Sequence, residues 1–220
     1  MSSKIARSQL TTTSYAILGL LAVKPWTTYE LAQQMQRALG QFWPRAESKL
    51  YEEPKKLVAH GLAEATSGMV GKRPRTVYSI TAEGRQALAV WVPKPGAGPV
   101  IEFEALVKIF YAEHGSKEDL LGNIEAVRRW VDERDLASEG ISRAYLDGEG
   151  QFPERLPWLV VCGQFLEEIS IAVERWTDWA TSVVESWPDD IAKAEPDRAV
   201  LEAQAARVEA RVREARRHAG

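Results

Sequence analysis

One stretch of this sequence, residues 42–62 (FWPRAESKLYEEPKKLVAHGL), constrains the fold of the rest of the chain most strongly. From Leu50, apolar residues follow at steps of 4, 7 and 8, which is the spacing of one face of a helix. The pair Trp43-Pro44 marks a turn before this helix, and Gly61 is typical of the position just after a helix ends. The stretch therefore predicts one short helix that packs by a narrow apolar face.

The other side of this predicted helix is polar and partly basic. It carries Arg45, Ser48, Glu52, Lys55 and Lys56, with Lys49 and Tyr51 at its flanks. A helix that packs by one side and presents hydrogen-bonding and cationic groups on the other can read base edges and contact phosphates in a DNA groove. An ordinary amphipathic surface helix has the same pattern, so the neighbouring segments must decide between the two interpretations.

The segments before this helix complete a three-helix pattern. Residues 11–23 are apolar on almost all sides and predict a buried helix, which the following Lys-Pro pair ends. Thr27 and Glu30 fit a capping box that starts a second helix over residues 29–39, and a glycine follows it. Two helices directly before the polar helix are typical of a helix-turn-helix domain.

Two short alternating segments, residues 62–66 and 76–80, follow the polar helix and predict a β-hairpin around a glycine-rich loop. The loop holds three cations within four residues, Lys72, Arg73 and Arg75. Three helices followed by a hairpin with a basic tip are the order of a winged helix-turn-helix. In such a domain the wing lies at the minor groove or on phosphates, where the negative potential favours arginine.

The charge of the chain is distributed unevenly. The 220 residues have a net charge of −3, but residues 1–92 hold 12 Lys and Arg against 6 Asp and Glu, whereas residues 93–220 hold 16 against 25. A basic N-terminal part indicates a polyanionic partner for that part alone. The single cysteine excludes an intramolecular disulfide, and the sequence has neither an apolar run of 18 residues nor a signal-peptide core. We therefore expect a cytoplasmic protein.

Four segments in this order resemble the N-terminal domain of PadR-family transcriptional regulators: TTTSYAILGLLA, YELAQQM, FWPRAESKLYEEPKKLVAHGLAE and KRPRTVYSITAEGRQAL. The likeness covers about residues 11–90. The family pattern in the third helix and at the junction after the wing is matched by Leu50-Tyr51, Lys55-Lys56-Leu57, Gly61-Leu62, Tyr78, Thr81 and Gly84. The resemblance implies a homodimer that binds DNA through this domain and dimerises through its C-terminal helices.

The sequence departs from the family pattern at Pro54, where the family usually has an apolar residue. A proline inside a straight helix removes a hydrogen-bond donor at a cost of about 3 kcal/mol, so we expect a kink near Glu53. Glu52 and Glu53 should repel phosphates, which leaves the phosphate attraction mainly to the wing and the N-terminal arm. Glu52 can also accept a hydrogen bond from cytosine.

The remainder of the chain predicts helices only. A fourth helix over residues 82–92 is followed by a linker rich in proline and glycine and by a connecting helix over residues 101–113. We divide the chain into a winged helix-turn-helix domain (1–94), a linker with a connecting helix (95–115) and a helical dimerisation domain with a possible ligand-sensing role (116–220).

Three long helices are predicted in the C-terminal part, beginning at Ser116, near Pro157 and at Pro196. The first has an apolar face of Leu120, Ile124, Val127 and Val131, and the second one of Phe165, Ile169, Ala172, Trp176, Val183 and Trp187. The third has a heptad seam of Leu201, Ala205, Val208, Val212 and Ala215. Such a seam must be covered, either within its own subunit or by a second copy, and we expect at least part of this helix to lie in a dimer interface.

The sequence contains no constellation that predicts catalysis. Its three histidines are scattered, so we predict no metal site and no cofactor, and Cys162 in its apolar surroundings is predicted to be a buried, inert thiol. Many PadR-like regulators release DNA on binding phenolic or drug-like molecules, and the eight tryptophans could serve such a ligand. The candidate pocket residues are Trp91, Phe103, Trp130 and Trp176, although core or interface packing is the alternative for each of them.

The sequence thus predicts a mainly α protein with an N-terminal winged helix-turn-helix, a two-stranded wing and an all-helical C-terminal dimerisation domain. We expect a homodimeric transcriptional repressor, not an enzyme, that binds a palindromic double-stranded DNA operator and responds to a small aromatic effector. The DNA-binding candidates are Arg45, Ser48, Lys49, Tyr51, Glu52, Lys55, Lys56, Lys72, Arg73 and Arg75. The alternative is a winged-helix protein-interaction module without specific DNA binding.

Overall fold

The computed structural model describes residues 10–70 and 73–218, and the side chains at positions 69, 70, 73 and 74 lie outside this description. The chain divides into two compact units, Met1–Val100 and Ile101–Gly220. Each unit is described by itself.

Four helices form most of the N-terminal unit: α1 (Thr12–Val23), α2 (Thr28–Leu39), α3 (Glu47–Ala59) and α4 (Ala82–Trp91). The capping box predicted at the start of α2 is confirmed. The Thr27 hydroxyl accepts the backbone N–H of Glu30 at 3.2 Å, and the Glu30 carboxylate accepts the backbone N–H of Thr27 at 2.9 Å. Helix α1 has the same arrangement between Thr11 and Ser14.

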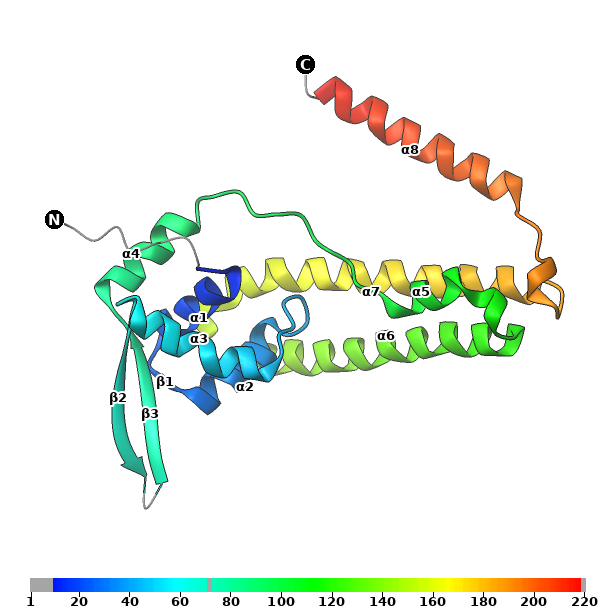
Figure 1. Ribbon diagram of the computed structural model, residues 1–220. Coiled ribbons are helices and arrows are strands. Elements are labelled where there is room, and N and C mark those ends of the chain that lie inside the picture. Colours follow the sequence, from blue (N-terminus) through cyan, green and yellow to red (C-terminus); the bar gives the residue numbers. More distant parts are fainter. Residues whose placement is uncertain (1–9, 71–72, 219–220) are drawn as a thin grey trace. The chain divides into compact units, whose positions relative to one another are not determined.

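The sheet of this unit has three antiparallel strands in the order β1-β3-β2: β1 (Trp26–Thr27), β2 (Ala63–Val70) and β3 (Arg73–Ile80). Strands β2 and β3 form the predicted hairpin, which projects from the helices (Figure 1). Both are longer than predicted, because pairing runs in register from Ala63 opposite Ile80 to Val70 opposite Arg73. The two-residue strand β1 was not predicted, since two residues are too few to show a period of two.

Helix α1 is the centre of the N-terminal core and packs against α2, α3, α4 and β3. The buried apolar side chains come from α1, α2, α3 and the three strands: Ile17, Leu18, Leu21, Trp26, Leu31, Ala32, Met35, Leu50, Leu57, Ala63 and Tyr78. A helix that is covered on most sides must be apolar on most sides, as the sequence of α1 predicts.

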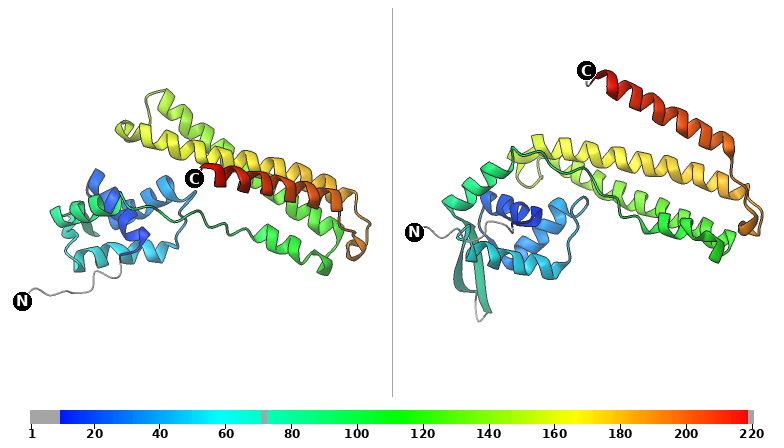
Figure 2. Two further views of the ribbon diagram at one scale, coloured as in Figure 1. Left: turned by 90° about the horizontal axis from the view of Figure 1, so that it is seen from above. Right: turned by 45° about the horizontal axis from the view of Figure 1, so that its top comes forward.

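The C-terminal unit is entirely helical within the residues described. It contains α5 (Glu104–Phe110), α6 (Lys117–Leu146), α7 (Leu156–Glu185) and α8 (Arg198–His218), with 3-10 turns at Ala112–His114, Pro153–Arg155 and Ile191–Lys193. Helices α6 and α7 lie side by side along their length in all three ribbon views (Figures 1 and 2). The connecting helix is shorter than its predicted range of residues 101–113, because α5 begins at Glu104 and ends at Phe110.

The contact between α6 and α7 uses the predicted face of α6 and part of the predicted face of α7, because Trp176 and Trp187 pack, partly buried, against its core. Leu120, Ile124, Val127 and Val131 of α6 are buried as predicted. The residues of α7 that are fully buried are smaller ones, Ser170, Thr177, Ala180 and Val184. Small residues allow two helix axes to approach closely, so they occupy the contact line and the larger side chains are placed beside it.

A large apolar surface of the C-terminal unit remains exposed on the single chain. It includes Trp158, Val160, Val161, Phe165 and Trp179 of α7, and Leu201, Val208 and Val212 of α8. Cys162 of α7 is also exposed, so the prediction of a buried thiol is wrong for the single chain.

Helix α7 and the turn before it, Pro153–Glu185, are long and apolar enough by length and composition to cross a membrane, and little of this segment is buried. The pairing of α7 with α6 accounts for one of its sides only. An apolar helix that packs in a protein interface has the same composition as a membrane span, so composition alone does not separate the two.

Candidate nucleic-acid interface

Helix α3 has a defined end and a defined inner face. At its C-terminus Gly61 has a φ of +71°, and the backbone N–H groups of Leu62 and Gly61 donate to the carbonyls of Leu57 and Val58, both at 2.9 Å. This is a Schellman motif, for which glycine is the favoured residue because a positive φ strains any residue with a Cβ. The helix continues through Pro54, which is buried.

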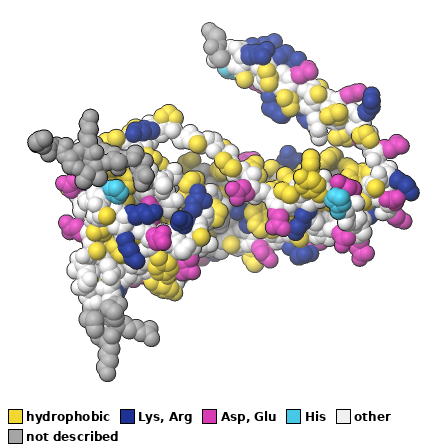
Figure 3. All heavy atoms as spheres, in the orientation of Figure 1, with side chains coloured by type: hydrophobic (Ala, Val, Ile, Leu, Met, Phe, Trp, Pro, Cys, Tyr) yellow, Lys and Arg dark blue, Asp and Glu magenta, His cyan; other side chains and the backbone are white. Residues whose placement is uncertain are grey.

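The inner face of α3 consists of Leu50, Glu53, Pro54 and Leu57, whereas the sequence predicted Val58 in place of Glu53. The described DNA-binding candidates lie on the other side. Arg45, Ser48, Lys49, Glu52, Lys55 and Lys56 are exposed, and Tyr51 is half-buried. Lys and Arg side chains gather over the α3 region on the face shown in Figure 3, with an acidic group among them.

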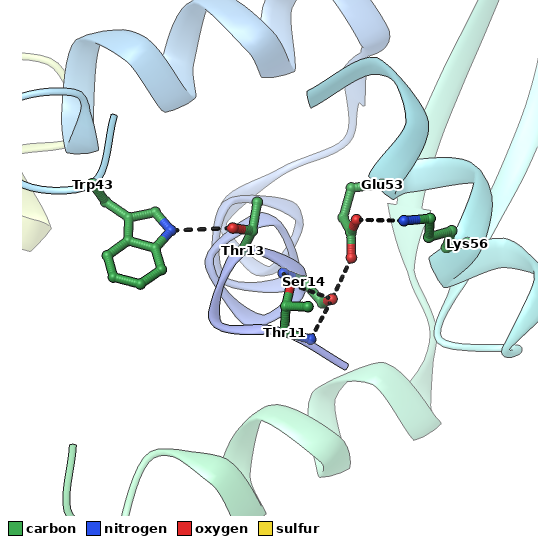
Figure 4. A network of polar contacts seen from close by, with 6 residues as sticks. All are labelled: Thr11, Thr13, Ser14, Trp43, Glu53 and Lys56. Carbon is green, nitrogen blue, oxygen red and sulfur yellow. Dashed lines mark hydrogen bonds and ion pairs between the residues drawn. The ribbon is translucent and has the colours of Figure 1, made fainter. Parts of the chain in front are cut away.

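Glu53 lies under this surface rather than on it. The Ser14 hydroxyl of α1 donates to one oxygen of the Glu53 carboxylate, and the ammonium group of Lys56 lies 3.3 Å from the other oxygen (Figure 4). Ser14 is fully buried, and Glu53 is 5% exposed. Its carboxylate is turned toward α1 and paired there, and the expectation that Glu53 repels phosphates stays a prediction.

A second contact joins α1 to the turn before α3. The indole N–H of Trp43 donates to the Thr13 hydroxyl at 3.2 Å (Figure 4). The guanidinium of Arg45 lies 4.0 Å from the centroid of the Trp43 ring, in cation–π geometry, and donates to the Pro44 carbonyl at 2.6 Å. Arg45 is thus held at the N-terminal end of α3, although its side chain is exposed.

The Tyr51 hydroxyl donates to the Glu47 carboxylate one helical turn earlier at 3.0 Å. This hydrogen bond raises the pKa of Tyr51, with smaller contributions from desolvation and from the nearby negative charge. The phenol therefore stays neutral at physiological pH, and its oxygen still has a lone pair that can accept a hydrogen bond.

The wing contributes one described cation to this part of the unit. Arg75 of β3 donates to both carboxylate oxygens of Glu30 at 3.1 Å, which joins the wing to the first turn of α2. The pKa of Glu30 is lowered, chiefly by its hydrogen bonds from Thr27 and further by the charge of Arg75. The other two predicted wing cations, Lys72 and the side chain of Arg73, lie outside the described residues.

The comparisons with known proteins agree with this architecture. Residues 17–90 match the model of the "Transcriptional regulator PadR-like family". Through this domain the chain is similar to PadR-like regulators. The negative transcriptional regulator PadR of Bacillus subtilis is 30% identical over 107 residues, a match that covers 48% of this chain and 59% of that relative.

Solved structures of Bacillus subtilis PadR share the fold of this chain. The complex with operator DNA is 22% identical and has a TM-score of 0.62 over 80% of this chain and 98% of the solved one. The complex with p-coumaric acid is 22% identical and has a TM-score of 0.59 over 80% and 100%. At this level of identity the likeness shows the fold, a winged helix-turn-helix followed by long helices.

The four aromatic residues predicted to border a pocket do not all belong to one unit. Trp91 belongs to the N-terminal unit and stacks on Tyr15 with ring centroids 4.7 Å apart. Phe103 and Trp176 meet edge to face at 5.8 Å in the C-terminal unit. Trp130 is partly exposed and carries the Arg134 guanidinium 4.7 Å from its ring centroid.

Sequence reasoning missed the contacts that position the interface of the PadR-like domain: Thr13, Ser14, Trp43 and Glu53. A signal for them is present in the sequence. Thr13 and Ser14 are polar residues in an apolar helix, and Glu53 stands three residues after Leu50, on the apolar stripe of α3. A polar side chain at a core position requires a partner, so three such residues on two predicted helices could have been paired.

Proposed function

We propose that this chain is a homodimeric, DNA-binding transcriptional regulator of the cytoplasm that represses transcription from a palindromic operator and is released by an aromatic effector. The observation that carries this proposal is the exposed side of α3, next to the wing, where three cations (Lys49, Lys55 and Lys56) accompany Ser48, Tyr51 and Glu52, with Arg45 in the turn just before the helix. Cations supply affinity for phosphates, and the neutral and acidic polar groups can discriminate bases.

The position of Glu53 also supports DNA binding over the alternative of a protein-interaction module. The protein-interaction alternative was suggested by the two adjacent glutamates in α3, which are unfavourable for contact with DNA. Glu53 is buried against Ser14, so Glu52 alone of this pair remains on the exposed face. The exposed face is therefore more basic than the sequence of the helix indicates.

The exposed apolar surface supports a homodimer. No residue of α8 is buried on the single chain, although its heptad seam is apolar. A second copy would cover such a seam, and a twofold axis would present two α3 helices to two half-sites of a palindrome. The name of the Bacillus subtilis relative, a negative regulator, favours repression.

The C-terminal unit has features that suit an aromatic effector with an acidic group. Among the described residues, the Arg134 Nε is buried without a hydrogen-bond partner next to the Trp130 ring. The Bacillus subtilis relative was solved with p-coumaric acid, an aromatic carboxylate. An arginine beside an aromatic ring matches both parts of such a molecule, and quenching of tryptophan fluorescence by p-coumaric acid tests this part of the proposal.

A gel-shift titration tests the DNA-binding part directly. The full chain is titrated onto the DNA upstream of its own gene and onto an unrelated fragment, each at two salt concentrations. Selective binding that weakens at the higher salt is expected, because cations of α3 and the wing displace counterions. Binding that is weak and equal on all DNA would favour the protein-interaction alternative.

Two variants test which residues of α3 contact phosphates and which discriminate bases. Lys49→Ala should weaken binding to both fragments and reduce the slope of log K against log salt by about 1. Ser48→Ala should instead change the ratio of the binding constants for the two fragments and leave the slope of log K against log salt unaltered. An unaltered slope for Lys49→Ala would remove this lysine from the phosphate contacts.

A further inference from the structure

We propose that Glu53 is a positioning residue of the DNA-binding face. Its carboxylate, held by Ser14 of α1, fixes the Lys56 ammonium group for contact with a DNA phosphate. This inference rests on the proposed DNA-binding function and names a residue that acts through another, since Glu53 itself is turned away from the exposed face.

The first observation is the cost of placing a carboxylate at this position. Glu53 lies on the inner face of α3 between Leu50 and Leu57, and it is 5% exposed. Burial of a charged group is unfavourable unless it is paired, and a hydrophobic residue of similar size often gives equal or greater stability. Stability alone therefore does not account for a glutamate here.

The second observation is that the carboxylate is held on both sides. The Thr11 backbone N–H donates to the Ser14 hydroxyl oxygen at 2.9 Å, so this hydroxyl is already fixed by the capping box of α1. Its proton is donated to Oε1 of Glu53, and Oε2 faces Lys56 at 3.3 Å (Figure 4). Each oxygen has a different partner, which leaves the carboxylate a single orientation.

The third observation concerns the lysine. The Lys56 side chain is 54% exposed, and its ammonium group needs one of three N–H donors for Glu53. The other two can donate to a phosphate. A lysine that is already paired loses less conformational entropy when it binds than a free one. Lys55 is also exposed to solvent but has no ion pair within the described parts of the chain, so it serves as the matched control.

The test is a double-mutant cycle on the full-length protein. Glu53→Gln keeps an acceptor for Ser14 but removes the charge that holds Lys56. This change is combined with Lys56→Ala and, separately, with Lys55→Ala. Dissociation constants are measured by fluorescence anisotropy on a duplex enriched from a random pool by the unaltered protein, and on an unrelated duplex.

Glu53→Gln should weaken binding to the enriched duplex about fivefold in the unaltered protein and in the Lys55→Ala background, but less than about twofold in the Lys56→Ala background. Tighter binding of Glu53→Gln to both duplexes would overturn the inference, because Glu53 would then merely repel phosphates. An equal loss in both lysine backgrounds would also overturn it, since Glu53 would then act on the fold as a whole.

A second variant guards against a folding defect. If Glu53→Gln melts below the assay temperature, Ser14→Ala is used in the same cycle, because it releases the other side of the carboxylate, and the same dependence on Lys56 is expected.

An unaltered protein that shows no preference for any duplex would refute the proposed function. A protein that binds selectively but shows no coupling between Glu53 and Lys56 overturns this inference alone.

Discussion

At the scale of single residues, polar side chains in the core of the N-terminal unit set the geometry of its exposed face. Thr13 and Ser14 are buried on one turn of α1 and contact Trp43 and Glu53 respectively. Hydrogen bonds are directional, whereas apolar contacts are not, so these two contacts fix how α3 is rotated as well as how closely it packs.

Gly84 gives a prediction about close packing at the start of α4. A Cβ at this position would lie 2.1 Å from the backbone oxygen of Leu62 and 2.8 Å from the Ile80 side chain. Gly84→Ala should therefore lower the free energy of unfolding by roughly 1–3 kcal/mol. Gly19 of α1 has no atom within 4 Å of its ideal Cβ position, so Gly19→Ala should stabilise the protein by about 1 kcal/mol. Urea unfolding of both variants measures these two changes. Equal changes in the free energy of unfolding for Gly84→Ala and Gly19→Ala would contradict the prediction.

Glu30 gives a prediction about pH. Its pKa is below the usual value of 4.5, mainly because of the Thr27 hydrogen bonds and additionally because of Arg75. A lowered pKa in the folded state means that the stabilisation is present above pH 4.5 and is lost as the pH falls through the folded-state value. Between pH 5 and pH 3 the free energy of unfolding should therefore fall more in the unaltered protein than in Glu30→Gln. Parallel curves for the two proteins would argue against this contribution.

At the scale of elements, the two ends of α3 are determined in different ways. Its beginning has no side-chain cap and depends on the Trp43 and Arg45 contacts before it. Its end depends on Gly61, whose φ is +71° and whose ideal Cβ position has no atom within 4 Å. The cost of a side chain at Gly61 would thus be conformational rather than steric.

This distinction predicts the effect of two substitutions at Gly61. Gly61→Ala should cost roughly 1–2 kcal/mol of unfolding free energy, because a residue with a Cβ is strained at this φ. Gly61→Asn should cost less, because asparagine tolerates the left-handed region better. Thermal melting of the two variants decides the point, and a larger loss for asparagine would indicate a steric cause.

The α6–α7 pair shows a limit of periodicity as a guide to packing. The sequence of α7 has a broad apolar surface, and periodicity alone does not specify which part of it faces α6. Contact through Ser170, Thr177, Ala180 and Val184 leaves several larger residues exposed, among them Trp158, Phe165 and Trp179. The size of side chains, in addition to their polarity, determined the contact line.

At the scale of the whole molecule, an acidic C-terminal part with exposed apolar helices follows a basic N-terminal part. The excess of Asp and Glu over Lys and Arg after residue 92 would repel DNA, so this part suits contacts with a second copy. In the proposed dimer, the second DNA-binding unit would bind its half-site with little further loss of association entropy, because the first unit is already bound to the same DNA.

This proposal predicts the effect of charge on the seam of α8. Val208→Asp should shift the protein from a dimer toward a monomer in sedimentation equilibrium, because a carboxylate would be buried without a partner. Ala210 lies off the seam on the same exposed helix, so Ala210→Asp should leave the mass unaltered. A Val208→Asp protein with unchanged mass would place the interface elsewhere.

The sequence by itself determined the helices of the N-terminal domain, its wing and the burial of α1, because capping boxes, prolines, glycines and apolar periodicity are local signals. It also indicated which side chains of α3 are exposed. The tertiary structure decided what the inner face of α3 contacts, since the partner of Glu53 is 39 residues away in the chain. It likewise decided the pairing of Arg75 with Glu30 and the choice of small residues along α7. Such contacts depend on how elements distant in sequence are brought together, and no local pattern specifies that arrangement.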